Sequence, residues 1–320
     1  DSGQYGEYYT PRAVAKIMSR ILVTSEVKSV KIYDPASGSG SLLLALAHQI
    51  GEQKCSIYSQ DISQKSSEFL RLNLILNNLT HSLNNVIKGN TLTNPYHKEN
   101  NDLKKFDYIV SNPPFKTDFS DDRETLASEA HKIRFFAGVP NIPNKDKKKM
   151  AVYLLFIQHI IYSLGPKGRA AIVVPTGFLT AQSGIERKIR AKLIDEKMLR
   201  GVVSMPSNIF ATTGTNVSVI FIDRTNTNGK ILLMDASKLG ATVKDGKNQK
   251  TLLSPEEEDL IIETFNKQKV KDNFTIVVSY NQIMEKNYSL SAGQYFDLKI
   301  EYADITNREF SIKINSFEKN

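Results

Sequence analysis

Apolar residues recur in two alternating patterns along the first 225 residues of the chain. Spacings of three and four residues, which place side chains on one helix face, predict helices at residues 14–22, 41–50, 64–77, 151–164 and 183–195. Short runs rich in Val, Ile, Tyr and Phe predict strands at residues 30–33, 56–59, 85–88, 106–111, 169–175, 199–205 and 217–223. Thr10 is predicted to cap the first helix, with Pro11 at its first position.

Strands and helices that alternate at this spacing predict an α/β fold, in which a mostly parallel sheet is covered by helices on both faces. In such sheets the ligand lies beyond the carboxyl ends of the strands. The alternation weakens after residue 225, where one strand at 230–235 and one helix at 255–267 are predicted. We therefore expect a main domain, residues 1–225, and a C-terminal extension, residues 226–320, packed on it.

Residues 116–150 form a long polar stretch without a clear pattern. A structureless segment of this length is uncommon in a compact domain unless it is functional or disordered. Four lysines cluster near its end, and they fit either phosphate contacts or a solvated loop: Lys145, Lys147, Lys148 and Lys149. The basic residues of the 183–195 helix are predicted to form a solvated face: Arg187, Lys188, Arg190 and Lys192.

The charge balance is basic, because 42 Lys and Arg exceed 34 Asp and Glu and give a net charge of +8. This suits a polyanionic partner without requiring one. The single cysteine, Cys55, cannot form an internal disulfide. No apolar run reaches the ~18 residues that span a membrane, and the five histidines show no ligand spacing. We expect a cytoplasmic protein with no metal site and no membrane partner.

The first candidate for chemistry is a glycine-rich loop, Asp34-Pro35-Ala36-Ser37-Gly38-Ser39-Gly40, between a predicted strand and a predicted helix. Its glycines allow a tight turn and close approach of a ligand to the backbone. Asp61 ends the next strand, where a carboxylate can accept hydrogen bonds from ribose hydroxyls. Together they indicate a nucleotide-type cofactor, and a plain turn with a surface aspartate is the alternative. The G-x-G-x-x-G spacing of dinucleotide sites is absent.

The second candidate is the run Asn112-Pro113-Pro114-Phe115, which follows the predicted strand 106–111. Two prolines fix the backbone and remove two amide donors, so the Asn112 side-chain oxygen and the Pro113 carbonyl remain as rigid acceptors. An exocyclic amine can donate to both, which favours a tetrahedral nitrogen and frees its lone pair. Phe115 can then stack on the nucleobase that carries this amine. A proline-rich turn with a core phenylalanine is the alternative.

These motifs together resemble those of DNA N6-adenine methyltransferases. Their order along the chain is that of the gamma class, in which the cofactor-side motif comes before the glycine loop. The N-terminal run Gly6-Glu7-Tyr8-Tyr9-Thr10-Pro11-Arg12 precedes the glycine loop, as the cofactor-side motif of that family does. The chain is most similar to the modification (M) subunit of type I restriction-modification systems, and the resemblance extends over nearly the whole sequence. It implies a Rossmann-like S-adenosylmethionine-dependent methyltransferase fold and makes residues 1–225 the catalytic domain.

The resemblance also implies roles at matching positions. Tyr9, Thr10 and Pro11 would border the methionine end of S-adenosylmethionine, Asp61 would hold its ribose, and Ile62 would lie against its adenine. The loop beneath the cofactor would comprise Asp34, Ser37, Gly38 and Gly40. Asn112 and Pro113 would hold the target amine, with Pro114 fixing the turn and Phe115 on the base.

Three departures from the family pattern matter. Ser37 stands where cysteine is common, and Asn90 stands where an acidic residue is frequent, although an amide can still bond the cofactor adenine. The helical N-terminal region typical of M subunits is not in this sequence, so we expect either part of such a subunit or a shorter relative. This puts complex assembly in question more than chemistry.

The implied reaction is methyl transfer from S-adenosylmethionine to N6 of an adenine flipped out of double-stranded DNA. The implied partners are a specificity subunit, which would choose the DNA site, and a restriction subunit, with the C-terminal extension in contact with them. Two alternatives stay open: an amino methyltransferase that acts on RNA or a protein glutamine, and a non-catalytic cofactor-binding scaffold.

Overall fold

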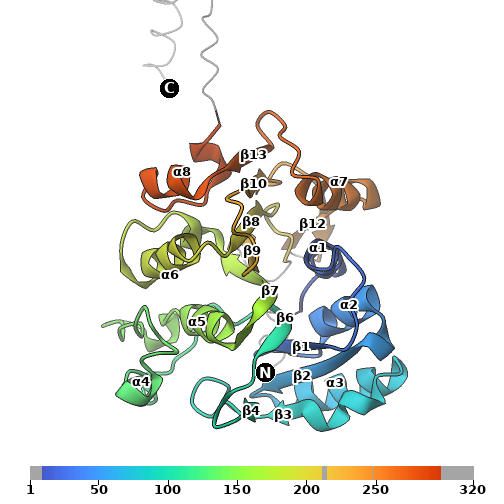
Figure 1. The fold of residues 1–320 in the computed structure, drawn as a ribbon, viewed down its shortest axis with the longest axis vertical. Coiled ribbons are helices and arrows are strands. Elements are labelled where there is room, and N and C mark those ends of the chain that lie inside the picture. Colours follow the sequence, from blue (N-terminus) through green and yellow to red (C-terminus); the bar gives the residue numbers. More distant parts are fainter. Residues whose placement is uncertain (1–8, 211–214, 247, 297–320) are drawn as a thin grey trace, which may run out of the picture.

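A nine-stranded sheet forms the centre of the molecule, in the order β13-β10-β8-β9-β7-β6-β1-β2-β3 (Figure 1). The computed structural model describes residues 9–210, 215–246 and 248–296. The strands of the sheet are β1 Val30–Asp34, β2 Cys55–Asp61, β3 Val86–Lys88, β6 Phe106–Ser111, β7 Leu164–Pro175, β8 Leu199–Ser204, β9 Val217–Asp223, β10 Ile231–Asp235 and β13 Thr275–Val278.

All pairings from β3 across to β7 are parallel, and so is that of β8 with β10. β9 lies antiparallel between β7 and β8, and β13 is antiparallel to β10 at the edge. The expected mostly parallel α/β sheet is therefore confirmed. Its parallel arrangement brings the carboxyl ends of β1, β2 and β6 to one edge.

Helices cover both faces of the sheet (Figure 1). One face carries α1 Arg12–Leu22, α2 Ser41–Ile50, α3 Gln64–Leu76 and α7 Pro255–Asn266. The other carries α5 Tyr153–Ser163, α6 Gly184–Asp195 and α8 Tyr280–Glu285. Each helix buries an apolar stripe, such as Leu42, Leu43 and Leu46 of α2, and this burial is the main favourable term in folding. No helix among the described residues is long and apolar enough to cross a membrane.

Residues after 225 continue the same sheet, because β10 pairs with β8 and β13 pairs with β10. α7 begins at a capping box formed by Ser254 and Glu257, with Pro255 in its first turn. It packs against α1, and Ile261 and Phe265 belong to the same apolar core as Ile17 and Ile21. The division at residue 225 stays a prediction, and residues 297–320 of the proposed extension lie outside the described residues.

The 116–150 segment is packed, not structureless. It holds the short helix α4 Arg123–Leu126 and two 3-10 turns, Glu129–His131 and Lys147–Lys149. Besides the two apolar cores on the faces of the sheet, a third apolar cluster joins this segment to α5 and to the loop after β3. It is formed by Leu92, Phe119, Leu126, Phe135, Met150, Val152, Leu155 and Phe156. The segment thus shares a small core with α5 and the loop after β3.

Several predicted details were wrong. Helix α1 begins at Arg12 with Pro11 as its N-cap, and Thr10 makes no capping bond. Strand β7 begins at Leu164, five residues before the predicted start, because Leu164 pairs with Phe106 of β6. Arg190 is completely buried, although its helix was predicted to expose it. Two short hairpins were not predicted: β4 Lys98–Glu99 with β5 Asp102–Leu103, and β11 Ala241–Asp245 with β12 Asn248–Leu252.

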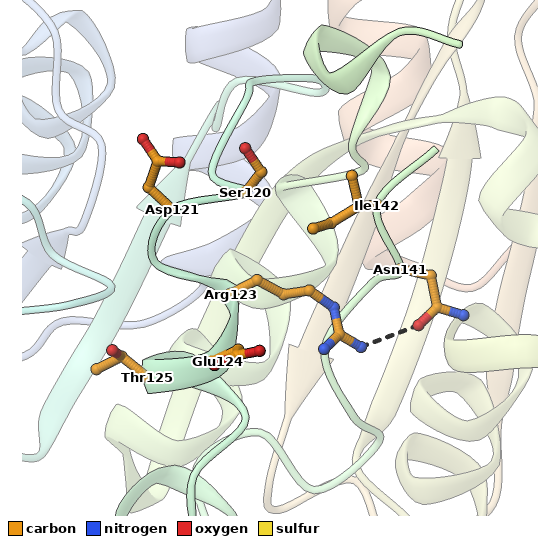
Figure 2. A pocket seen from close by; sticks show the side chains of 7 residues that line it. All are labelled: Ser120, Asp121, Arg123, Glu124, Thr125, Asn141 and Ile142. Carbon is orange, nitrogen blue, oxygen red and sulfur yellow. Dashed lines mark hydrogen bonds between the residues drawn. The ribbon is translucent and has the colours of Figure 1, made fainter. Parts of the chain in front are cut away.

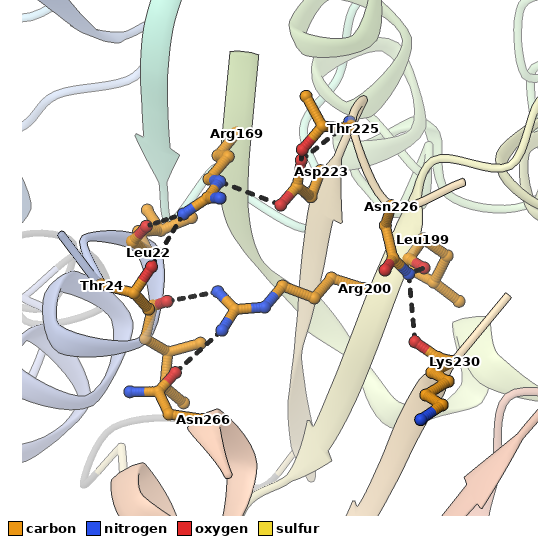
Figure 3. A network of polar contacts seen from close by, with 11 residues as sticks. Leu22, Thr24, Arg169, Leu199, Arg200, Asp223, Thr225, Asn226, Lys230 and Asn266 are labelled. Atoms are coloured by element: carbon orange, nitrogen blue, oxygen red, sulfur yellow. Dashed lines mark hydrogen bonds and ion pairs between the residues drawn. The ribbon is translucent and has the colours of Figure 1, made fainter. Parts of the chain in front are cut away.

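Two arginines hold α1 against the sheet at the edge opposite the carboxyl ends of β1, β2 and β6 (Figure 3). Arg169 of β7 donates to Leu22 O at 3.2 Å and pairs with Asp223 of β9 at 2.9 Å. Arg200 of β8 donates to Asn266 Oδ1 of α7 at 2.9 Å and to Ile21 O. The last turn of α1 is therefore held by two strands and a second helix.

Candidate active site

The glycine loop runs from the carboxyl end of β1 to the start of α2, as its sequence predicted. Gly38 and Gly40 have φ of +51° and +86°, which L side chains rarely adopt. A Cβ on Gly38 would meet nothing within 4 Å, whereas one on Gly40 would collide with Leu70 of α3. Gly40 therefore allows α3 to approach, and Gly38 leaves open space above the loop.

Asp34 is buried at the base of this loop, with 2% of its surface exposed. One carboxylate oxygen, Oδ1, accepts from Ala36 N at 3.0 Å and from Ser111 Oγ at 2.8 Å. Burial raises the pKa of Asp34 to about 7, although these two hydrogen bonds oppose the shift and the nearby charge of Asp61 adds to it. The sequence did not single out Ser111, and its only signal is a hydroxyl directly before Asn112 at a strand end.

Asp61 ends β2 and supports the glycine loop from the neighbouring strand. Its carboxylate accepts from Gly38 N and from Ser63 N, each at 2.8 Å. Burial raises its pKa, and the two backbone hydrogen bonds oppose that shift. Ile62 follows with its side chain 69% exposed at the same edge. A carboxylate beside an open apolar side chain can serve the ribose and base of a nucleoside.

Asn90 lies in the loop after β3, next to the end of β2. Its side-chain oxygen accepts from Leu92 N at 3.0 Å and Thr93 N at 3.4 Å, so this oxygen closes its own turn. Thr91 Oγ1 donates to Pro35 O at 2.7 Å and fixes this loop against the glycine loop. The Asn90 amide nitrogen remains the group that can donate to a ligand.

The run Asn112-Pro113-Pro114-Phe115 follows β6 directly, as predicted. Asn112 Nδ2 donates to Thr10 Oγ1 at 3.3 Å, so Thr10 holds this amide instead of capping α1. The Asn112 side-chain oxygen is left to accept. Pro113 is buried, and Phe115 is half-buried with its ring edge-on to Tyr153 of α5 at 6.1 Å. The turn therefore presents acceptors and an aromatic ring on a packed base.

A small pocket unites the N-terminal run, the glycine loop and the Asn112 turn. It is lined by Thr10, Asp34, Ala36, Ser37, Ser39, Ser41, Leu42 and Asn112. Tyr9, 62% exposed, lies just outside this lining. Asp61, Ile62, Asn90 and Phe115 do not line the pocket, although their strands end at the same edge. Gly6, Glu7 and Tyr8 lie outside the described residues.

The residues present fit an S-adenosylmethionine-type cofactor. The Ser37 hydroxyl is buried, and no described residue bonds to it. It stands with Asp34 and Thr10 around the pocket, while Asp61 and Ile62 lie at the end of the next strand. This donor set suits an amino acid at one end and a nucleoside at the other. No group of three or more His, Cys, Asp or Glu in the described ranges could hold a metal ion.

A second hollow lies on the 116–150 segment and contains none of the predicted site residues (Figure 2). It is lined by Ser120, Asp121, Arg123, Glu124, Thr125, Asn141 and Ile142. Arg123 spans it, donating to Asn141 Oδ1 at 2.9 Å and to Pro140 O at 3.1 Å. Its mixture of charges recommends no particular ligand, and we assign no cofactor to it.

Comparison with known proteins gives consistent results. The type I restriction enzyme MpnII methylase subunit of Mycoplasma pneumoniae is 31% identical over 309 residues, covering 94% of this chain and 54% of that protein. The MjaIX methylase subunit of Methanocaldococcus jannaschii is 27% identical, over 98% of this chain and 55% of that protein. The chain thus spans about half the length of these relatives.

A solved structure agrees with both the sequence and the fold. The type I restriction-modification methyltransferase subunit of Streptococcus thermophilus superposes with a TM-score of 0.75 at 27% identity. That match covers 91% of this chain and 60% of the other. The fold is that of S-adenosylmethionine-dependent methyltransferases. The family model described as N-6 DNA Methylase matches residues 1–304, and this chain belongs to that family.

Proposed function

We propose that this chain transfers a methyl group from S-adenosylmethionine to N6 of adenine in DNA, as the methyltransferase part of a type I modification subunit. The Asn112 turn carries the proposal. The Asn112 side-chain oxygen and the Pro113 carbonyl lie on a rigid backbone that directly follows Ser111, whose hydroxyl donates to Asp34. Membership of the N-6 DNA methylase family supports adenine in DNA over RNA or a glutamine amide.

The chain's own residues would position the amine. When bound, S-adenosylmethionine supplies a methyl group on a sulfonium, which is already activated for transfer to nitrogen. Asn112 Oδ1 and Pro113 O would accept hydrogen bonds from the two N–H groups of the adenine amine and free its lone pair. N6 would form the new C–N bond as the methyl–sulfur bond breaks, and one N–H proton would then leave to solvent. Holding reactants in line in this way supplies a large part of many enzymatic rate gains.

The target base must leave the duplex to reach the Asn112 turn, at a cost of a few kcal/mol. The half-buried ring of Phe115 would offset part of that cost, because stacking of a base on an aromatic ring contributes about 1–3 kcal/mol. Tyr153 lies edge-on to the Phe115 ring, with centroids 6.1 Å apart, and Tyr153 is itself edge-on to Phe178 at 6.2 Å. Phe115 is therefore packed on its neighbours while part of its surface stays accessible.

The relatives are named as methylase subunits of type I restriction enzymes, and we propose the same setting for this chain. A specificity subunit would then choose the DNA site, and a restriction subunit would complete the enzyme. The C-terminal extension would contact these partners.

Asn112→Ala tests the role of the turn. We expect methyl transfer to adenine to fall by at least a hundredfold, because one of the two acceptors is lost, while calorimetric titration shows nearly unchanged cofactor binding. Asp61→Ala is the reciprocal variant and should lose cofactor binding. An Asn112→Ala chain with full methylation of DNA would contradict the proposal and favour the scaffold alternative. Methyl transfer to RNA or glutamine but not to DNA adenine would favour the other alternative.

A further inference from the structure

Three consecutive lysines stand on the 3-10 turn Lys147–Lys149, and all three are exposed. The proposed reaction gives them no role. Their turn is firmly built, since Asp146 Oδ1 accepts from Lys148 N at 3.0 Å and Asp146 O accepts from Lys149 N at 3.1 Å. The next residue, Met150, is buried in the third apolar cluster with Phe119 and Phe156. The lysines are therefore presented from a packed base.

This turn is joined to the segment that follows the Asn112 turn. Thr117, two residues after Phe115, donates its backbone N–H to Met150 O at 3.1 Å. The lysine turn is thus bonded to the segment that leaves the Asn112 turn. The pKa of Asp118 also indicates that the lysines lie near this segment. It is lowered first by hydrogen bonds from Ser120 and further by the charges of Lys147 and Lys148.

The charges on this turn are only partly neutralised. Asp146 pairs with Lys149 at 3.6 Å, and Asp118 is close enough for the charges of Lys147 and Lys148 to lower its pKa. Within the described ranges, Lys147 and Lys148 take part in no ion pair. The exposed Lys116 lies directly between Phe115 and Thr117. Exposed positive charge therefore lies beside the segment that leaves the Asn112 turn.

An adenine flipped onto the Asn112 turn would carry its flanking phosphates toward these lysines. Contacts to phosphates fix the register of a protein on DNA without reading sequence, and lysines on a fixed turn suit that role. We propose that Lys147, Lys148 and Lys149 contact the DNA phosphates that flank the flipped adenine. This inference rests on the proposed function.

The test compares two triple variants that each remove three positive charges. The first is Lys147→Gln, Lys148→Gln, Lys149→Gln. The control is Lys28→Gln, Lys197→Gln, Lys230→Gln, whose exposed lysines precede β1, β8 and β10 at the opposite edge of the sheet. Binding of a fluorescein-labelled duplex, with adenine opposite an abasic site, is measured by anisotropy over a range of salt with S-adenosylmethionine present. Calorimetric titration with the cofactor shows whether each variant is folded.

We expect the first triple to bind the cofactor normally and to lose about 0.9 in the slope of log affinity against log salt for each phosphate contact removed. The control should keep the wild-type slope. The single variant Lys148→Gln should lose up to about 0.9 and serves if the triple fails to fold. An equal loss in both triples, or no loss in either, would overturn the inference while leaving the proposed function intact. A wild-type chain that binds the cofactor but no duplex would overturn the inference alone, because the proposed specificity subunit can supply the DNA contacts that the proposed function requires.

Discussion

The pKa of the Asp34 carboxylate is set largely by its buried surroundings. It lies almost wholly out of water, and its pKa is raised from the ordinary 3.8 to about 7, chiefly by burial. Between these values the unfolded chain is ionised at this position while the folded chain holds a proton. The folded state therefore binds more protons, and the contribution of Asp34 to stability falls as the pH rises from about 4 to about 7.

Asp34→Asn should remove this dependence. An amide oxygen can still accept from Ala36 N and Ser111 Oγ, and it carries no charge to desolvate. We expect the variant to gain stability over the wild type as the pH rises from 4 to 7, by at most about 1.4 kcal/mol per pH unit, and to keep a constant advantage above 7. Denaturant unfolding across this range measures it. The exposed Asp107→Asn is the control, and a difference that does not change with pH would contradict the argument.

At the scale of elements, the strands and helices around the site could be predicted because their apolar spacing is strong. The ends of β1, β2 and β6 carry Asp34, Asp61 and Ser111, and the predicted residues meet at one edge because those strands are parallel neighbours. The β11–β12 hairpin could not be predicted, since its polar residues give no apolar alternation. Neither could the small core of the 116–150 segment, whose apolar residues lie far apart in sequence.

Arg190 of α6 shows most clearly what a pattern of charges omits. It was predicted to be solvated with its neighbours, yet it is completely buried and donates to the carbonyls of Phe178, Ala181 and Tyr288. These carbonyls lie after β7 and after α8, so only the tertiary fold brings them together. Burial lowers the pKa of Arg190 to about 10, which leaves it charged at neutral pH.

Arg190→Met should therefore destabilise the chain by about 2–5 kcal/mol, because it leaves one buried and two partly buried carbonyls without this donor. Lys188→Met on the same helix removes an exposed charge and should change stability by less than about 0.5 kcal/mol. Urea unfolding of both variants compares them directly. Similar small losses in the two would show that water replaces the guanidinium at these carbonyls.

At the scale of the whole molecule, the two edges of the sheet at which the strands begin and end carry different features. The carboxyl edge carries the pocket and the lysine turn, and the opposite edge carries the arginine contacts of Figure 3. α1 connects the two, because Thr10 lies just before its first turn and Leu22 ends it. Arg169 and Arg200 therefore hold the far end of the helix whose near end supports Asn112.

A double-mutant cycle on Arg200 and Asn266 tests this anchor. Arg200 donates to Asn266 Oδ1 at 2.9 Å, and Asn266 Nδ2 donates to Arg20 O at 3.2 Å, so α7, β8 and α1 share one set of contacts. Residues joined in this way usually couple by about 0.5–3 kcal/mol. We expect Arg200→Met and Asn266→Ala each to lower the free energy of unfolding, and the double variant to lose less than their sum. Additive losses would show that the two side chains act independently and that α1 is held by Arg169 and the apolar core instead.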